Sequence, residues 1–290
     1  MARRYLGETF DIHGGGIDLV FPHHENEIAQ SECATGHRPM ARYWLHNGHL
    51  MFDSGKMSKS IGNTVLIREI LDQVPAEALR LLYVESHYRS HLPYTGERLE
   101  DALASLDRLY QAKETLEEMA AEPATDSAAA LMSTFGEPAR ELAEAADTFQ
   151  ARFTDAMNED FNTALALSAL YELARAANRL GNQKKARKRA AALAKPALAA
   201  FQLAGEVLGL GGRPPADHFV EVRRKRLAAM GHSESEIEDL VSARWKARTE
   251  KRWPDADRLR DELVALGVVL MDGSDGTRWR MRIGEAPAAG

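Results

Sequence analysis

The sequence DIHGGGIDLVFPHHENE, at residues 11–27, holds a glycine triplet, two adjacent histidines and two glutamates. Glycines between short apolar runs are typical of an α/β layer. Pro22 suits the first turn of a helix, in which His23 and Glu27 would lie four residues apart on one face. A histidine and a carboxylate at that spacing can share a zinc ion, or they are simply exposed polar residues. His13 beside the glycines can approach a nucleotide closely, or it is a turn histidine.

A second motif, KMSKS, occupies residues 56–60. Two lysines three residues apart, flanked by serines and glycines, can close over a polyphosphate and neutralise the charge that develops as pyrophosphate leaves. The alternative for such a pair of lysines is a solvated basic turn. Lys56 and Lys59 are therefore candidate catalytic residues, and Met57 and Ser58 complete a candidate ATP-binding loop.

Composition and charge limit the class of protein. The 290 residues are 44% hydrophobic and 28% charged, as in a globular protein, and the net charge of −6 argues against binding a polyanion over the whole surface. The single cysteine, Cys33, permits no internal disulfide and fits a reducing cytoplasm. No uninterrupted apolar run reaches the roughly 18 residues of a membrane span, so no membrane partner is expected.

The pattern of the chain predicts an α/β part followed by a mostly α part. Alanine, leucine and charged residues at helical spacing begin near residue 75, and glycines and prolines at 209–215 break the pattern. Candidate strands at 268–270 and 279–282, around a glycine-rich turn, predict a terminal hairpin. We therefore predict four segments: 1–75, 76–119, 120–212 and 213–290.

The last segment combines basic and aromatic residues. Arginines and lysines between residues 244 and 261 are interleaved with Trp245 and Trp253, a composition that suits unstacked bases and their phosphates. Tryptophans at helical spacing also suit a core, and that alternative stays open. The candidate nucleic-acid contacts are Arg244, Arg248, Lys251, Arg278 and Arg280.

These motifs, from residue 10 to about residue 282, together resemble the cysteinyl-tRNA synthetase family of class I aminoacyl-tRNA synthetases. The resemblance implies a partial Rossmann-type catalytic domain, a connecting helical domain, a helical bundle of the tRNA-binding type and a small α+β anticodon-binding module. It also implies a monomeric cytoplasmic enzyme that activates cysteine with ATP, with Mg²⁺ accompanying the nucleotide, and transfers cysteine to tRNA(Cys).

The resemblance assigns roles to particular residues. It implies that His23 and Glu27 bind Zn²⁺, and that the ATP site is lined by His13, Gly14, Gly15, Asp18 and the 56–59 loop. The two cysteines of the family's zinc site do not occur in this chain, so we expect a zinc half-site and little or no activity from the chain alone. Two alternatives stay open: a non-catalytic tRNA-binding protein, and a related cysteine ligase with a non-tRNA acceptor such as an amino sugar.

Overall fold

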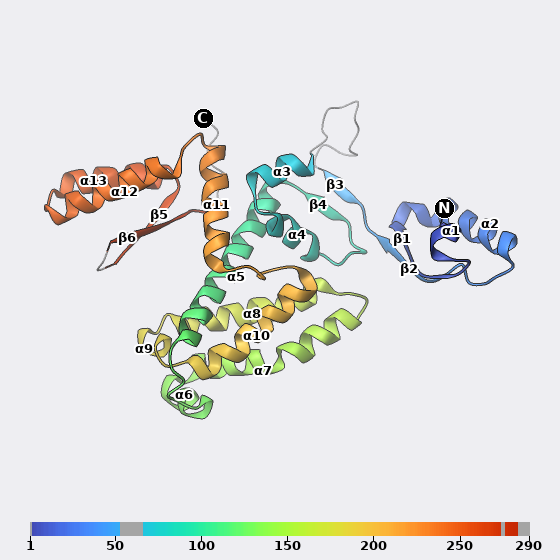
Figure 1. The fold of residues 1–290 in the computed structure, drawn as a ribbon, viewed down its shortest axis with the longest axis horizontal. Helices are drawn as coiled ribbons and strands as arrows, with labels where there is room; N and C mark the ends of the chain where they lie inside the picture. Colours follow the sequence, from blue (N-terminus) through green and yellow to red (C-terminus); the bar gives the residue numbers. More distant parts are fainter. Residues whose placement is uncertain (1, 53–65, 274–275, 284–290) are drawn as a thin grey trace.

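The computed structural model describes residues 2–52, 66–273 and 276–283. The molecule is elongated, with α/β elements at its N-terminal end, a helical bundle in the middle and a small C-terminal module on the opposite side (Figure 1). The order of elements confirms the predicted class, an α/β part followed by a mostly α part.

Two short parallel sheets form the N-terminal part. Strand β1 pairs with β2 in parallel, which places His13 opposite Trp44 and Gly15 opposite His46. The crossover between them passes through one 3-10 turn, one π turn and helix α2, as a parallel connection requires. Strand β3 pairs in parallel with the later strand β4. The bounds are α1 Ala2–Leu6, β1 Phe10–Gly16, η1 Ile17–Leu19, η2 Val20–His24, α2 Glu25–Thr35, β2 Ala41–Asn47, β3 Leu50–Phe52 and β4 Leu92–Tyr94.

The middle of the molecule is helical, because its apolar residues recur every three or four positions. Helix α5 begins where the Thr95 hydroxyl accepts a hydrogen bond from the Arg98 amide, and it buries a stripe that includes Leu99, Leu103 and Leu106. Asn162 caps helix α8 in the same way. The bounds are α3 Ile67–Gln73, α4 Ala76–Val84, α5 Gly96–Ala121, α6 Ala128–Phe135, α7 Glu137–Asn158, α8 Thr163–Gly181, α9 Lys184–Arg187 and α10 Ala191–Leu208.

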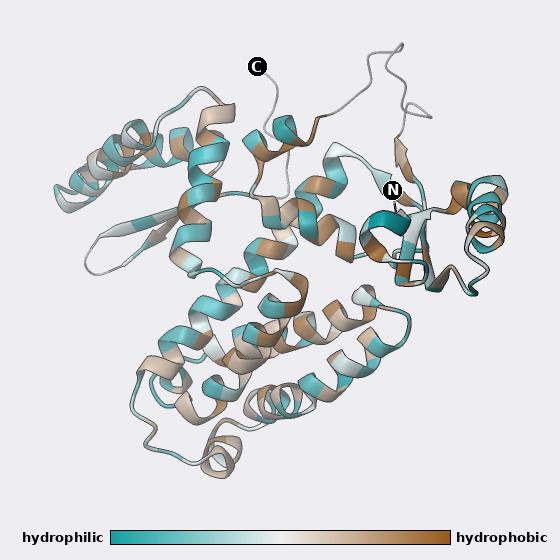
Figure 2. Ribbon diagram, turned by 45° about the vertical axis from the view of Figure 1, so that its right-hand side comes forward, coloured by the Kyte–Doolittle hydropathy of each residue, from teal (hydrophilic) through white to brown (hydrophobic). Residues whose placement is uncertain are grey.

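One contiguous core holds these helices together. It runs from Ile70 to Val222 and includes residues on both sides of the predicted boundary at 119/120, so the two predicted segments share a core. Figure 2 shows hydrophobic and hydrophilic stretches alternating along these helices, the pattern of helices that bury one face. Helix packing is close enough at Gly181 that an added Cβ would lie 2.2 Å from Thr115 Cγ2.

Helix α10 is long and apolar enough, by length and composition, to cross a membrane. Its apolar residues are interrupted by Lys195 and Glu206, so they form no continuous apolar run. In the structure α10 contributes Leu193, Ala197, Phe201 and Ala204 to the bundle core. The core helix of a soluble protein can have the same length and composition, so α10 is weak evidence for a membrane span.

The C-terminal module comprises residues 213–283 and has a small core of its own. Strands β5 and β6 pair antiparallel, with Leu270 opposite Trp279, which confirms the predicted hairpin. The buried residues of this second core are Leu227, Ile237, Val241, Leu263, Val268, Trp279 and Met281. The bounds are α11 Pro215–Ala229, α12 Glu234–Thr249, α13 Trp253–Ala265, β5 Val268–Asp272 and β6 Thr277–Met281.

Candidate functional site

Polar and aromatic side chains gather where β1, β2 and the start of α2 meet. The Nε2 atom of His13 on β1 lies 3.0 Å from Oε2 of Glu27 on α2. The Nδ1 atom of His24 lies 2.7 Å from Nε2 of His46 on β2. Trp44 on β2 contacts both pairs, and its ring centroid lies 4.6 Å from that of His13 and 5.1 Å from that of His24.

His24 is the buried member of this cluster. Its side chain packs over β1, where an added Cβ on Gly15 would lie 2.7 Å from His24 Cε1, so this close approach requires glycine. Burial lowers the pKa of His24, and the neighbouring His13 and His46 lower it further. The neutral imidazole that results is the form that binds a metal ion.

The cluster contains donors that fit a metal ion. Among the described residues, the ligand atoms of His13, His24 and Glu27 lie within 4.8 Å of one another and form the group that could hold one. Imidazole nitrogen and carboxylate oxygen are donors that zinc accepts, and a catalytic zinc site commonly has three protein ligands. The residues of this segment therefore fit zinc.

The two predicted zinc ligands, His23 and Glu27, lie in different surroundings. Glu27 belongs to the cluster, whereas the side chain of His23 is exposed and its ring centroid lies 5.4 Å from that of His24. Residue spacing predicts no metal role for His13 or His24, and it gives no signal for Trp44 or His46 as site residues. The parallel pairing of β1 with β2 brings His13 beside Trp44, and helical spacing carries no signal of that pairing.

The predicted nucleotide-binding residues lie along the same edge. Gly14 is exposed at the end of β1, and Asp18 is exposed in the turn that follows it. An added Cβ on Gly16 would lie 2.4 Å from Asp18 Oδ1, so the acidic side chain folds back over the glycine triplet. The predicted loop residues Lys56, Met57, Ser58 and Lys59 lie outside the described residues.

Several predicted nucleic-acid contacts are held within the C-terminal module or against the bundle. Arg244 donates two hydrogen bonds to Asp272, at 2.8 and 2.9 Å, and Arg248 forms an ion pair with the same carboxylate. The Arg244 guanidinium holds the pKa of Asp272 far below its usual range. Arg280 lies 2.5 Å from Glu114 of helix α5.

The remaining candidates face solvent. Lys251 is exposed in the turn between α12 and α13, and Arg278 is exposed on β6. The tryptophans of the module differ in exposure. Trp253 at the start of α13 is 56% exposed, Trp245 of α12 is half-buried, and Trp279 of β6 is buried. The structure thus assigns Trp279 to the core of the module and leaves Trp253 open to a partner.

Three family models match consecutive parts of the chain. The class I tRNA synthetase (C) catalytic domain matches residues 1–104, the DALR domain matches 152–211, and the cysteinyl-tRNA ligase anticodon binding domain matches 230–280. With the α/β segment described above, these matches define a class I aminoacyl-tRNA synthetase chain.

Curated relatives narrow the class. The cysteine–tRNA ligase of Geotalea uraniireducens is 41% identical over 284 residues, which cover 97% of this chain and 57% of the relative. That of Halorhodospira halophila is 45% identical over 280 residues, covering 97% and 53%. The chain belongs to the cysteinyl-tRNA synthetase family, which confirms the resemblance, and it spans about half the length of the curated relatives it matches.

A solved structure was also matched, the ternary complex of LeuRS with tRNA and LeuAMS from Agrobacterium radiobacter. The match covers 70% of this chain and 28% of the matched LeuRS chain, with a TM-score of 0.49 and 16% sequence identity.

Proposed function

We propose that the protein represented by this chain is a cysteine–tRNA ligase of the cytoplasm that acts as a monomer. The observation that carries this proposal is the order of three matched domains along one chain: a catalytic domain, a DALR domain and an anticodon binding domain of the cysteinyl type. The first step joins the cysteine carboxylate to the α-phosphate of ATP and releases pyrophosphate. In the second step a hydroxyl of the terminal tRNA ribose attacks the acyl carbon, and AMP leaves.

The proposed ATP site combines the edge of β1 with the 56–59 loop. Its predicted residues on β1 and in the turn after it are His13, Gly14, Gly15 and Asp18, and the exposed Gly14 presents no side chain that would keep a nucleotide from the backbone. Lys56 and Lys59 would neutralise the negative charge that develops on the departing pyrophosphate, and Mg²⁺ would accompany the nucleotide. Catalysis on this view is positioning and charge stabilisation, without a covalent nucleophile.

The proposed zinc site centres on Glu27. His23 is its predicted partner, and the contacts of Glu27 with His13 and of His13 with His24 supply further imidazole donors beside it. A zinc ion held there would favour a thiolate over a hydroxyl, which distinguishes cysteine from serine. Among the proposed donors, His13 contacts both Glu27 and His24.

Two other functions are separated from this one by particular observations. A cysteine ligase with an amino-sugar acceptor has no use for the matched anticodon binding domain at residues 230–280. A non-catalytic tRNA-binding protein would keep that domain and would not respond to changes in the 56–59 loop. The exposed Lys251, Trp253 and Arg278 favour a nucleic-acid partner in either case.

The test measures two properties of the 290-residue chain. Binding to tRNA(Cys) is compared with binding to the same RNA carrying a changed anticodon, and we expect weaker binding of the second. The rate of cysteine-dependent ATP–pyrophosphate exchange by the unmodified chain is compared with the rate of the Lys59→Ala variant. We expect the two rates to be the same. Equal affinity for both RNAs would overturn the proposed anticodon recognition. Exchange above the control would show that the residues present suffice for cysteine activation.

A further inference from the structure

A row of acidic side chains runs along helix α5 on the face that meets the C-terminal module. Its members are Glu100, Asp107 and Glu114, each seven residues from the next. Seven residues are close to two full turns of an α-helix, so the three carboxylates lie on one stripe. We refer to this stripe and its partners as the charge seam.

Each carboxylate of the stripe has a partner in the C-terminal module. Arg226 of α11 is hydrogen-bonded to Glu100, and the side chain of Arg226 is buried. Arg280 of β6 lies 2.5 Å from Glu114, and its guanidinium stands 4.1 Å from the ring centroid of Phe219. The seam therefore joins α5 to both the helix and the hairpin of the module.

The middle partner is a fully buried histidine. His218 of α11 lies 3.3 Å from Asp107 through its Nε2 atom, and its ring stacks on Tyr110 at 4.1 Å between centroids. Its Nδ1 atom is buried without a hydrogen-bond partner. A buried polar atom without a partner costs free energy, so the stack on Tyr110 and the contact with Asp107 must together outweigh that cost in the folded chain.

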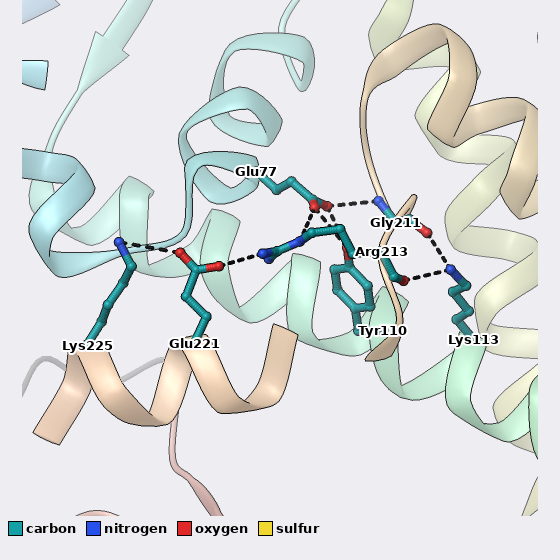
Figure 3. A network of polar contacts seen from close by, with 7 residues as sticks. All are labelled: Glu77, Tyr110, Lys113, Gly211, Arg213, Glu221 and Lys225. Atoms are coloured by element: carbon teal, nitrogen blue, oxygen red, sulfur yellow. Dashed lines mark hydrogen bonds and ion pairs between the residues drawn. The ribbon is translucent and has the colours of Figure 1, made fainter. Parts of the chain in front are cut away.

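A second network fixes the connection that leads into α11 (Figure 3). Glu77 of α4 accepts hydrogen bonds from the Gly211 amide and the Arg213 guanidinium, each at 2.9 Å. Lys113 of α5 donates to the Gly211 and Arg213 carbonyls, each at 2.8 Å. Arg213 also reaches Glu221 of α11 at 2.7 Å. Charged contacts from α4 and α5 therefore also hold the 211–213 connection that precedes α11.

Apolar contact across this junction is small. The bundle and the module have separate cores, and Val222 is the buried residue of the module that joins the bundle core, with Phe219 and Ile283 packed against it. Beside these three apolar residues, the charged and polar contacts described above cross the junction. Such contacts are directional, so they specify one register between two surfaces more strictly than an apolar patch does.

We propose that the charge seam positions the C-terminal module on the bundle. Glu100, Asp107 and Glu114 act as positioning residues that fix the angle of α11 and hence the place of the module. Under the proposed function, this sets the separation between the anticodon contacts and the catalytic domain. Reversing one charge of the seam should displace the module while both cores stay folded.

The experiment measures a distance between the bundle and the module in the full chain. Spin labels are placed on Ala151→Cys of α7 and Ser242→Cys of α12, two exposed positions, in a Cys33→Ser background. We expect a narrow distance distribution for this reference chain by pulsed electron spin resonance. Glu114→Lys should broaden or shift it, and adding Arg280→Glu should restore it by reversing the pair.

A matched control separates the seam from a general effect of charge reversal. Glu172→Lys breaks the ion pair with Arg152 between α7 and α8, away from the module, and should leave the distribution unchanged. Circular dichroism should show the same helix content in all variants. A distribution unchanged by both Glu114→Lys and Asp107→Asn would overturn the proposal, as would a change that the charge swap fails to restore.

The measurement does not depend on RNA. The proposal about tRNA geometry rests on the proposed function, whereas the distances are recorded without tRNA. Failure of the proposed function would show as an absence of tRNA(Cys) binding by the unmodified chain. Failure of the seam would show as distances that ignore its charges.

Discussion

The N-terminal α/β part and the helical bundle differ in how they hold their side chains. Among residues 3–52, whose burial the structure describes, His24, Met40 and Ala41 are the buried ones. Ile12, Phe21 and Tyr43 of the same part are 60%, 77% and 66% exposed. The bundle instead shares one contiguous core from Ile70 to Val222.

This difference bears on where the chemistry lies. Parallel strands are normally covered on both faces, yet β1 and β2 carry exposed apolar side chains. The contacts described around His13, Glu27, His24 and His46 are polar or aromatic. The candidate site is therefore held by side-chain contacts between elements, whereas the bundle is held by burial and is expected to be the more stable of the two.

The largest effect is expected from a core substitution in the bundle. Leu103 is fully buried in α5, so Leu103→Ala should reduce the free energy of unfolding by about 2–5 kcal/mol. Ile12→Ala, on the exposed strand β1, should change it by about 0.5 kcal/mol or less. Urea unfolding followed by far-UV circular dichroism measures both. Equal effects would contradict the comparison.

A smaller effect is expected in the C-terminal module, where one carboxylate ties α12 to the hairpin. Asp272→Asn weakens the contacts with Arg244 and Arg248, and should cost about 1–3 kcal/mol. Because the pKa of Asp272 is lowered in the folded chain, its contribution is present above about pH 4, the unfolded value, and is lost as pH falls further. Thermal unfolding from pH 7 to pH 3 should show the difference between variant and unmodified chain shrinking. The control is Asp261→Asn, an exposed partner of Arg260.

Within the N-terminal part, zinc affinity distinguishes two neighbouring histidines. Glu27→Gln removes a donor and should weaken zinc binding at least about tenfold in competition with a chelating dye, whereas His37→Ala should not. A larger loss for His23→Ala than for His24→Ala would support the pair predicted from the sequence. The reverse order would support the cluster that the structure brings together. No loss with Glu27→Gln would exclude both.

The sequence predicted the elements whose signal is local. Helical spacing identified the bundle, and the glycine-rich turn identified the hairpin of β5 and β6. The contacts of the site were harder to predict, because residues 17–24 pass through two irregular turns and Phe21 has a strand-like backbone, so residue spacing does not decide which histidine faces Glu27. The partner of Arg280 is Glu114, 166 residues away, and no local pattern indicates such a pair.

The smallest effect is expected where the bundle meets the end of the α/β part. Asp160, before α8, accepts hydrogen bonds from Arg89 at 2.5 Å and from Tyr88 at 2.7 Å, and these partners lower its pKa to about 2. The groups are exposed, so Asp160→Asn should lower Tm by about 2 °C or less at pH 7. Since the folded pKa lies below the unfolded value near 4, this difference should be complete above about pH 4 and disappear as pH falls toward 2. A difference between the two chains that persists unchanged at pH 2 would show that the carboxylate charge is not what joins the α/β part to the bundle here.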